Sequence, residues 1–173
     1  MKIPVFVSSP TKLNQDQQNT REAIFASLDD FGLEARALGQ SDYPTGLPLR
    51  EVLTIAKHCA GALILGFEQQ FAPEIEIRRG LPKTKDGGGG IAENISYPTP
   101  WNQLEAGILF ALGLPQLIFR EPGITGGIFD NGVSDVFIHP MPAADSNGKF
   151  EQQVNQVFLK WQADVRRHYY DES

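Results

Sequence analysis

The chain has 173 residues and a formal net charge of −6, from 15 Lys and Arg against 21 Asp and Glu. This length suits one domain that buries a core without disulfides or metals, and the acidic balance argues against binding to nucleic acid. Cys59 is the one cysteine, which excludes an internal disulfide framework; we expect it to be a small buried residue in a cytoplasmic protein. No stretch has the length and apolarity of a signal peptide or a membrane span, so no membrane partner is expected.

Short apolar runs alternate with helical periodicity along most of the chain. Runs rich in Val, Ile and Phe predict strands, and apolar residues spaced by three or four predict helices. We expect strands at residues 3–8, 33–38, 61–67, 116–120 and 136–139, and helices at residues 14–31, 49–59, 100–113 and 149–167. The run 33–38 includes charged residues, which suits a sheet edge, whereas the fully apolar run 61–67 suits the centre. The alternation predicts a single α/β domain, residues 1–173, with a doubly wound, mostly parallel five-stranded sheet.

Residues 68–98 interrupt this alternation of predicted strands and helices. They contain four consecutive glycines, Gly87 to Gly90, and no clear apolar period. A long segment without regular structure is unusual inside a compact domain. We therefore expect a flexible insertion that serves as an active-site lid, a mobile insertion or an oligomer contact.

The predicted helix at 100–113 carries a residue that needs a physical explanation. Thr99 suits the N-cap and Pro100 the first helical position, where a missing N–H costs nothing. After Gln103 the helix is apolar on every face except at Glu105. A helix that is apolar all round is normally buried, and a lone charge on it is expensive to desolvate unless a partner, water or substrate meets it.

Two interpretations of Glu105 are open. Trp101 lies four residues earlier, so both side chains project from one face, and apolar surroundings can raise the pKa of the carboxyl or leave it a poorly solvated anion. Alternatively, Glu105 forms a structural ion pair with Arg21, Arg50 or Arg120.

Polar residues follow the predicted strands at the edge where doubly wound sheets bind ligands. Ser8 and Ser9 can donate hydrogen bonds to a phosphate or ribose, or else cap the backbone. Asp42 and Tyr43 can hold a ribose and stack on a base, or else form a surface turn. No metal site is expected, because the histidines are scattered without metal-ligand spacing: His58, His139 and His168.

Several segments follow the pattern of a known family. A strand ends in Ser8-Ser9-Pro10, an apolar strand follows at 61–67, and Glu105-Ala106-Gly107 precedes a turn with Gly113-Leu114-Pro115. Together they resemble the nucleoside 2-deoxyribosyltransferase-like family. Trp101, four residues before Glu105, is similar to the pattern of TIR domains, a more distant resemblance. The resemblance covers roughly residues 3–140 and implies a flavodoxin-like or TIR-like fold.

This resemblance implies a domain that binds a nucleotide or nucleoside and cleaves or transfers its N-glycosidic bond. It implies that Glu105 is the catalytic carboxylate. It implies these substrate-binding residues: Ser8, Ser9, Pro10, Asp42, Tyr43, Phe67, Glu68 and Trp101. NAD would be a substrate and not a cofactor, no cofactor is expected, and a homo-oligomer is implied because related enzymes often complete the pocket with a neighbour's loop.

The alternatives on the same fold are a catalytically inactive nucleotide-sensing module and a TIR-like assembly module. The resemblance leaves the substrate open, because Tyr97-Pro98-Thr99-Pro100 stands where the transferases often carry Asp-x-Gly-Thr.

Overall fold

The computed structural model describes residues 2–37, 47–84, 87–145 and 147–171 and contains a five-stranded parallel sheet. Its strands are β1 (Ile3–Ser8), β2 (Leu33–Arg36), β3 (Ala62–Gly66), β6 (Gln116–Arg120) and β7 (Ile138–Pro140). Their order is β2-β1-β3-β6-β7, and every neighbouring pair is parallel. The predicted doubly wound sheet is confirmed, with the apolar β3 at its centre and the charged β2 at an edge. This strand order is that of flavodoxin-like folds.

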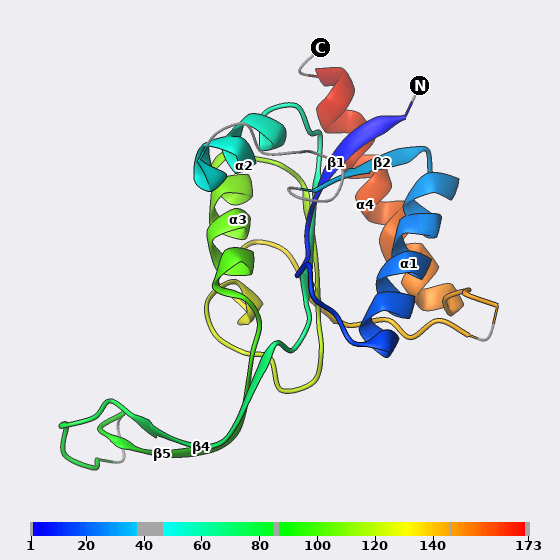
Figure 1. Cartoon of the computed structure of the whole chain (residues 1–173). Helices are drawn as coiled ribbons and strands as arrows, with labels where there is room; N and C mark the ends of the chain where they lie inside the picture. The colour runs from blue at the N-terminus through cyan, green and yellow to red at the C-terminus, as the bar shows by residue number, and fades with distance from the viewer. Residues whose placement is uncertain (1, 38–46, 85–86, 146, 172–173) are drawn as a thin grey trace.

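Helices cover both faces of the sheet (Figure 1). One layer holds α1 (Gln15–Asp30) and α4 (Gln152–Asp171), and the other holds α2 (Pro48–Ala56) and α3 (Pro100–Ala111). The helices were predicted at their observed places: the start of α3 matches, and the other ends differ by one to four residues. None of the described helices combines the length and apolarity needed to cross a membrane.

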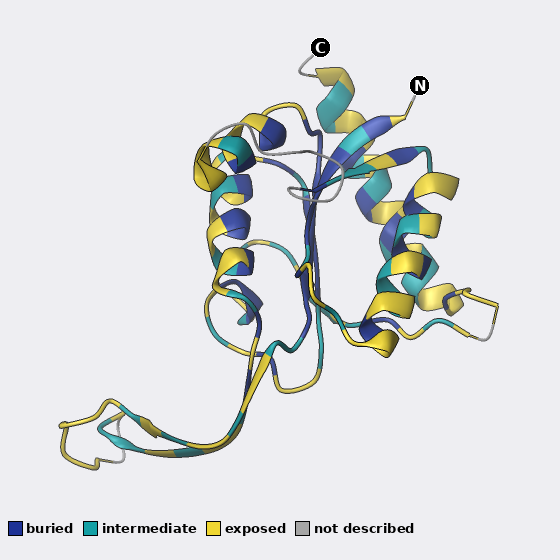
Figure 2. Ribbon diagram, in the orientation of Figure 1, coloured by how far each residue is buried: buried dark blue, intermediate teal, exposed yellow. Residues whose placement is uncertain are grey.

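The central strands are buried (Figure 2), and side chains that follow each other along a strand pack against opposite helix layers. Val5 and Val7 pack in the cluster that contains α1 and α4, whereas Phe6 packs in the cluster that contains α2 and α3. Because the side-chain period of a strand is two, Ser8 points to the same side as Phe6, toward α3. Cys59 is buried in the α2–α3 cluster, as predicted.

The helix starts follow from local capping. Asn14 caps α1: its side chain accepts from the Gln17 N–H, and the Gln17 side chain accepts from the Asn14 N–H. Thr99 caps α3 by accepting from the Asn102 N–H, with Pro100 at the first position, as the sequence predicts. The cap fixes where α3 begins, and therefore where Glu105 lies along it.

Residues 68–98 contain regular structure, so the prediction of a segment without it is wrong. β4 (Gln70–Ile77) and β5 (Gly90–Tyr97) pair as an antiparallel hairpin, called the arm below, which projects away from the sheet (Figure 1). Most of its side chains are exposed or half-buried. Polar and apolar residues alternate at Glu74-Ile75-Glu76-Ile77 in β4, where the two isoleucines are half-buried and the two glutamates are exposed. Cross-strand backbone hydrogen bonds to β5 complete the arm.

Candidate functional site

The candidate site lies where the strand order reverses. β1 and β3 are neighbours, and the chain leaves their carboxyl ends toward opposite faces of the sheet, which opens a crevice at this point. α3 begins at the same edge, because the chain reaches it directly from β5 (Figure 1). A pocket of about 220 Å³ opens there, lined by Ser9, Pro10, Thr11, Thr99, Trp101 and Glu105.

Glu105 is buried, with 9% of its surface exposed. Desolvation raises the pKa of its carboxyl from an ordinary 4.5 to about 7, and a side-chain hydrogen bond with Ser8 opposes that rise. Near neutral pH the group therefore exists in both protonation states. A buried carboxyl of this kind can act as a general acid or base or, when ionised, as a nucleophile.

The alternative prediction of a structural ion pair does not hold for Glu105. Within the described part of the chain no ion pair joins Glu105 to an arginine. The guanidinium of Arg21 donates to the Pro10 carbonyl, and that of Arg120 donates to the carbonyls of Ile124 and Phe129. The negative charge of Glu105 is thus left without a neutralising cation among these groups.

Two buried polar side chains stand behind the pocket. Ser8, from β1, is wholly buried, and Asn102, one turn before Glu105 on α3, is 1% exposed. The Asn102 Nδ2 donates to Ser8 Oγ at 2.8 Å. The carboxyl of Glu105 therefore meets a hydrogen-bonded polar wall on the sheet side.

Trp101 forms the outer wall of the pocket. Its side chain is 41% exposed, and it lines the pocket together with Glu105, as the four-residue spacing predicts. An indole face of this kind can stack on a planar ring. The pocket is smaller than the roughly 300–1,000 Å³ typical of sites for drug-sized ligands, so its described walls fit one ring and not a whole nucleotide.

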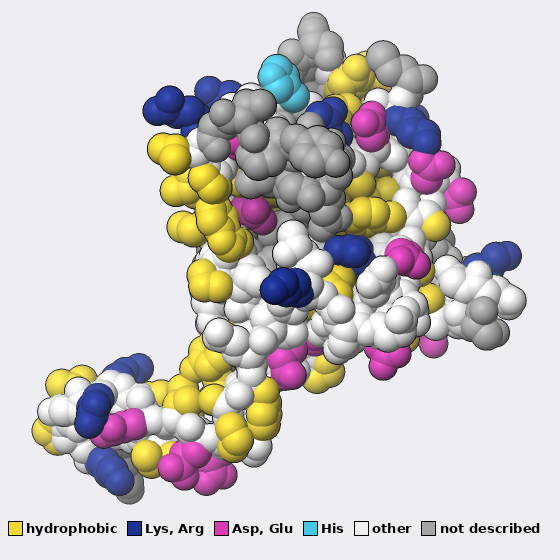
Figure 3. Space-filling view, in the orientation of Figure 1, with side chains coloured by type: hydrophobic (Ala, Val, Ile, Leu, Met, Phe, Trp, Pro, Cys, Tyr) yellow, Lys and Arg dark blue, Asp and Glu magenta, His cyan; other side chains and the backbone are white. Residues whose placement is uncertain are grey.

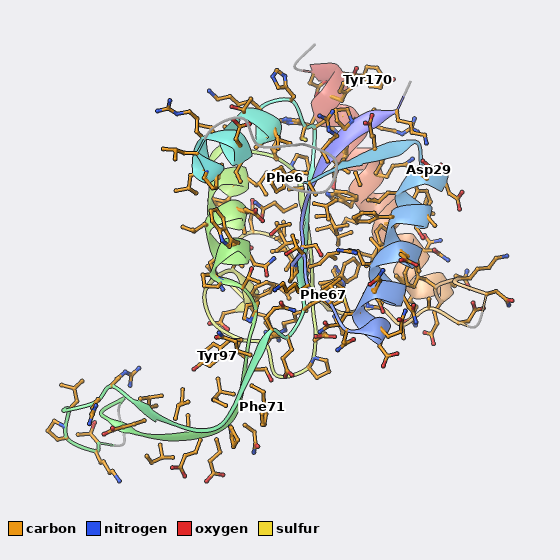
Figure 4. All side chains as sticks on the ribbon, viewed as in Figure 1. Phe6, Asp29, Phe67, Phe71, Tyr97 and Tyr170 are labelled. Carbon is orange, nitrogen blue, oxygen red and sulfur yellow. The ribbon has the colours of Figure 1, made fainter. Side chains whose placement is uncertain are left out.

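The structure brings Ser9, Pro10, Trp101 and Glu105 to one pocket and places Ser8 directly behind it. Two other predicted substrate-binding residues, Phe67 and Glu68, do not line this pocket. Phe67 is wholly buried in the cluster that contains α1 and α4, between the end of β3 and the start of the arm (Figure 4). Asp42 and Tyr43 fall outside the described residues.

Glu68 belongs to a polar cluster at the base of the arm. Its carboxylate accepts from the Ser96 hydroxyl, and its backbone N–H donates to the Glu121 carboxylate. Gln17 donates to both the Glu68 carbonyl and the Glu121 carboxylate. Glu68 does not line the pocket, and its contacts anchor the arm to α1 and to the end of β6.

Sequence reasoning missed three residues of the site. Thr11 lines the pocket, Thr99 does so in addition to capping α3, and Asn102 supports Ser8. A signal for Asn102 was present, because a residue three positions before Glu105 shares its helix face. Nothing local to the sequence signals that Ser8 would be its partner.

Other side-chain clusters and cavities among the described residues are weaker candidates for a reactive site. The described residues hold no group of three or more His, Cys, Asp or Glu side chains that could bind a metal ion. Larger cavities of about 480 and 490 Å³ lie between α4 and the start of β6, and between α1 and the segment before α4. Neither contains a carboxyl as buried as that of Glu105.

The strand order and the pocket define the chain as an α/β protein of flavodoxin-like topology with a candidate site at the topological switch point. No family model, curated protein sequence or solved structure matches the chain.

Proposed function

We propose that the chain cleaves or transfers the N-glycosidic bond of a nucleoside or nucleotide, with Glu105 as the catalytic carboxylate. The observation that carries the proposal is the buried Glu105 carboxyl, which faces no described cation and opens on a pocket at the switch point. The resemblance to nucleoside 2-deoxyribosyltransferases and TIR domains supports the reaction class, and NAD is among the candidate substrates.

The proposed chemistry uses the negative charge that burial makes costly. An oxocarbenium-like transition state develops positive charge at the anomeric carbon, which a nearby carboxylate stabilises. In the transfer version, a Glu105 oxygen bonds to the anomeric carbon while the base departs with the electron pair of the N-glycosidic bond. Water or a second base then takes the sugar from Glu105 and restores the carboxylate.

The residues that line the pocket can bind parts of such a substrate. The described pocket takes one ring of the substrate, either a planar base stacked on the Trp101 face or a sugar hydrogen-bonded to the hydroxyls of Ser9, Thr11 and Thr99. A pocket for one ring next to the carboxylate brings one side of the scissile bond close to Glu105.

The test is base release from NAD and from a panel of nucleosides, followed by chromatography. Glu105→Gln keeps the shape of the side chain but cannot form the anion, so we expect base release to fall by at least about 100-fold. Glu22→Gln, on the exposed surface of α1, is the matched control and should leave the rate unchanged. Equal rates for wild type and Glu105→Gln would contradict the proposal. Saturable nucleotide binding without release would indicate the sensing module instead.

One observation favours a second candidate, an assembly module on the same fold. Apolar side chains are exposed along α3 and around α2 (Figure 3), among them Leu47, Leu49, Leu53, Leu104 and Phe110. Exposed apolar patches often mark protein–protein contacts. Concentration-dependent self-association, measured by light scattering, together with no nucleotide binding would favour this candidate.

A further inference from the structure

The outer part of the arm has one face on which glutamates gather. Successive side chains of a strand point to opposite faces, and cross-strand partners share a face. Glu74 is the partner of Glu93, and Glu76, two residues further along β4, lies on the same face. Ile91, the partner of Glu76, completes this face, and all four side chains are exposed. These four residues form the acidic face of the arm.

The repulsion on the acidic face is not relieved inside the chain. Glu74 and Glu93 lie directly opposite each other, where like charges destabilise a strand pair. Arg79 forms an ion pair with Glu76 at 3.3 Å. Among the described residues, no ion pair joins Glu74 or Glu93 to a cation. A surface that combines positive charge with apolar side chains is therefore the partner that this face fits.

The outer side of α2 is such a surface. Leu49 and Leu53 lie one turn apart on it and are 48% and 37% exposed. Arg50 and Lys57 lie three residues before and four residues after Leu53, so they share its side of the helix, and both are exposed. Figure 3 shows basic and apolar side chains next to each other in this part of the molecule. Two cations beside two leucines match the glutamates and the isoleucine of the acidic face.

The acidic face and α2 lie at opposite ends of one helix layer. The arm leaves the core just before α3 begins, and α2 lies near the other end of α3, on the same side of the sheet (Figure 1). The 12 residues of α3 separate the two ends by about 18 Å. A rotation by 180° about an axis at the middle of α3 exchanges these ends, so that the arm of each copy meets α2 of the other. Such a contact is closed, because each copy uses both of its surfaces once.

We propose that the chain forms a two-fold symmetric dimer in which the acidic face of each arm docks on α2 of a second copy. Glu74 and Glu93 then contact Arg50 and Lys57, and Ile91 packs against the leucines of α2. None of these residues lines the pocket of Glu105, so the dimer does not depend on the proposed glycosidic chemistry. Its test needs no substrate, and its failure leaves the test of base release unchanged.

The test is the mass of the full-length protein in solution, measured by sedimentation velocity across the micromolar range of concentration. We expect wild type to dimerise. Glu74→Lys combined with Glu93→Lys reverses the charge of the arm, and Arg50→Glu combined with Lys57→Glu reverses that of α2. All four positions are exposed, so both double variants should fold. Each should raise the dissociation constant of the dimer by at least about 100-fold, because both contacts then bring like charges together.

Mixing the two double variants tests the pairing itself. In a mixed dimer the lysines of one arm meet the glutamates of one altered α2, and the unaltered arm meets the unaltered α2. Both contacts again join opposite charges, so the mixture should form a heterodimer although neither variant dimerises by itself. The control combines Glu22→Lys with Glu151→Lys, which changes the net charge as much as the arm variant does, at exposed positions on the layer of α1 and α4. This control should dimerise like wild type.

The proposal is overturned if wild type stays monomeric at every concentration. It is also overturned by a dimer that either double variant leaves intact, since another surface would then hold the copies together. Variants that stay monomeric when mixed would show that charge pairing between the arm and α2 is not what joins the copies. Dissociation of the control variant would attribute the effect to net charge and overturn the proposal as well.

Discussion

The surroundings of Glu105 disfavour the ionised form of its carboxyl. Burial desolvates it, no described arginine compensates, and the hydrogen bond with Ser8 only partly offsets the cost. The protein thus keeps at this position a group that weakens the folded state when ionised. Such a cost is common at functional sites, where pKa values are shifted for chemistry.

The raised pKa of Glu105 makes the stability of the fold depend on pH. The folded pKa of Glu105 is raised, so the protonated carboxyl stabilises the fold below about pH 4.5, and this stability is lost as pH rises through about 7. We expect Glu105→Gln, which stays neutral, to gain in stability relative to wild type across this window. The full difference is about 3 kcal/mol, from a pKa rise between 4.5 and about 7.

Urea unfolding at pH 5, 7 and 8.5 measures this difference. Glu22→Gln, at an exposed position, serves as the control and should differ from wild type by a constant amount. A gap between Glu105→Gln and wild type that stays the same at every pH would mean that burial does not shift the carboxyl.

At the scale of elements, α3 holds the loop that follows β6. Its Gln103 donates to the Gly126 carbonyl and accepts from the Ile128 N–H at the start of the 3₁₀ turn η1 (Gly127–Phe129). Gly127 has a φ of 57°, and a Cβ at this position would lie 2.3 Å from Gln103 Oε1. The Gln103 amide can lie this close to the backbone of η1 only because residue 127 has no side chain.

We predict that Gly127→Ala destabilises the protein by breaking both Gln103 hydrogen bonds. Gly132→Ala is the matched control, because Gly132 also has a positive φ, 83°, but has open space around it. Both variants carry backbone strain, so the difference between them reports the clash, and we expect about 1–3 kcal/mol more for Gly127→Ala. Equal free energies of unfolding in urea would show that η1 moves away without loss.

At the scale of the whole molecule, the arm is built onto a core that does not include it. No described residue of β4 or β5 belongs to either core cluster, and Phe71 is 54% exposed. The arm is held at its base by the Glu68 contacts and by a bridge between Ser96 and Ile124. An isolated hairpin is marginally stable, so the core supports the arm through this base.

We predict that most of the arm can be removed without unfolding the core. Ala72 and Ile95 are cross-strand partners, so replacing residues 73–94 with Asn-Gly closes a short hairpin and keeps the base. The free energy of unfolding should stay within about 1 kcal/mol of wild type. Thermal and urea unfolding measure this, and a core that no longer unfolds cooperatively would contradict it. Base release by the shortened protein then tests the arm as a lid or an oligomer contact.

Much of the fold could be predicted because its signals are local. The apolar runs of β1 and β6, the N-cap Thr99 and the Pro100 start of α3 lie within a few residues of the structure they specify. The arm was missed although Glu74-Ile75-Glu76-Ile77 alternates polar and apolar residues. That run is only four residues long, and its pairing partner β5 lies beyond the glycine-rich segment.

By itself the sequence determined the alternation of strands and helices, the central place of β3 and the presence of one carboxyl on an apolar helix. Only the tertiary structure decided what surrounds Glu105. The side-chain period of β1 sends Ser8 to one face, and the packing of α3 on that face sets Asn102 against it. Contacts between residues 94 positions apart depend on how the layers pack, which no local pattern records.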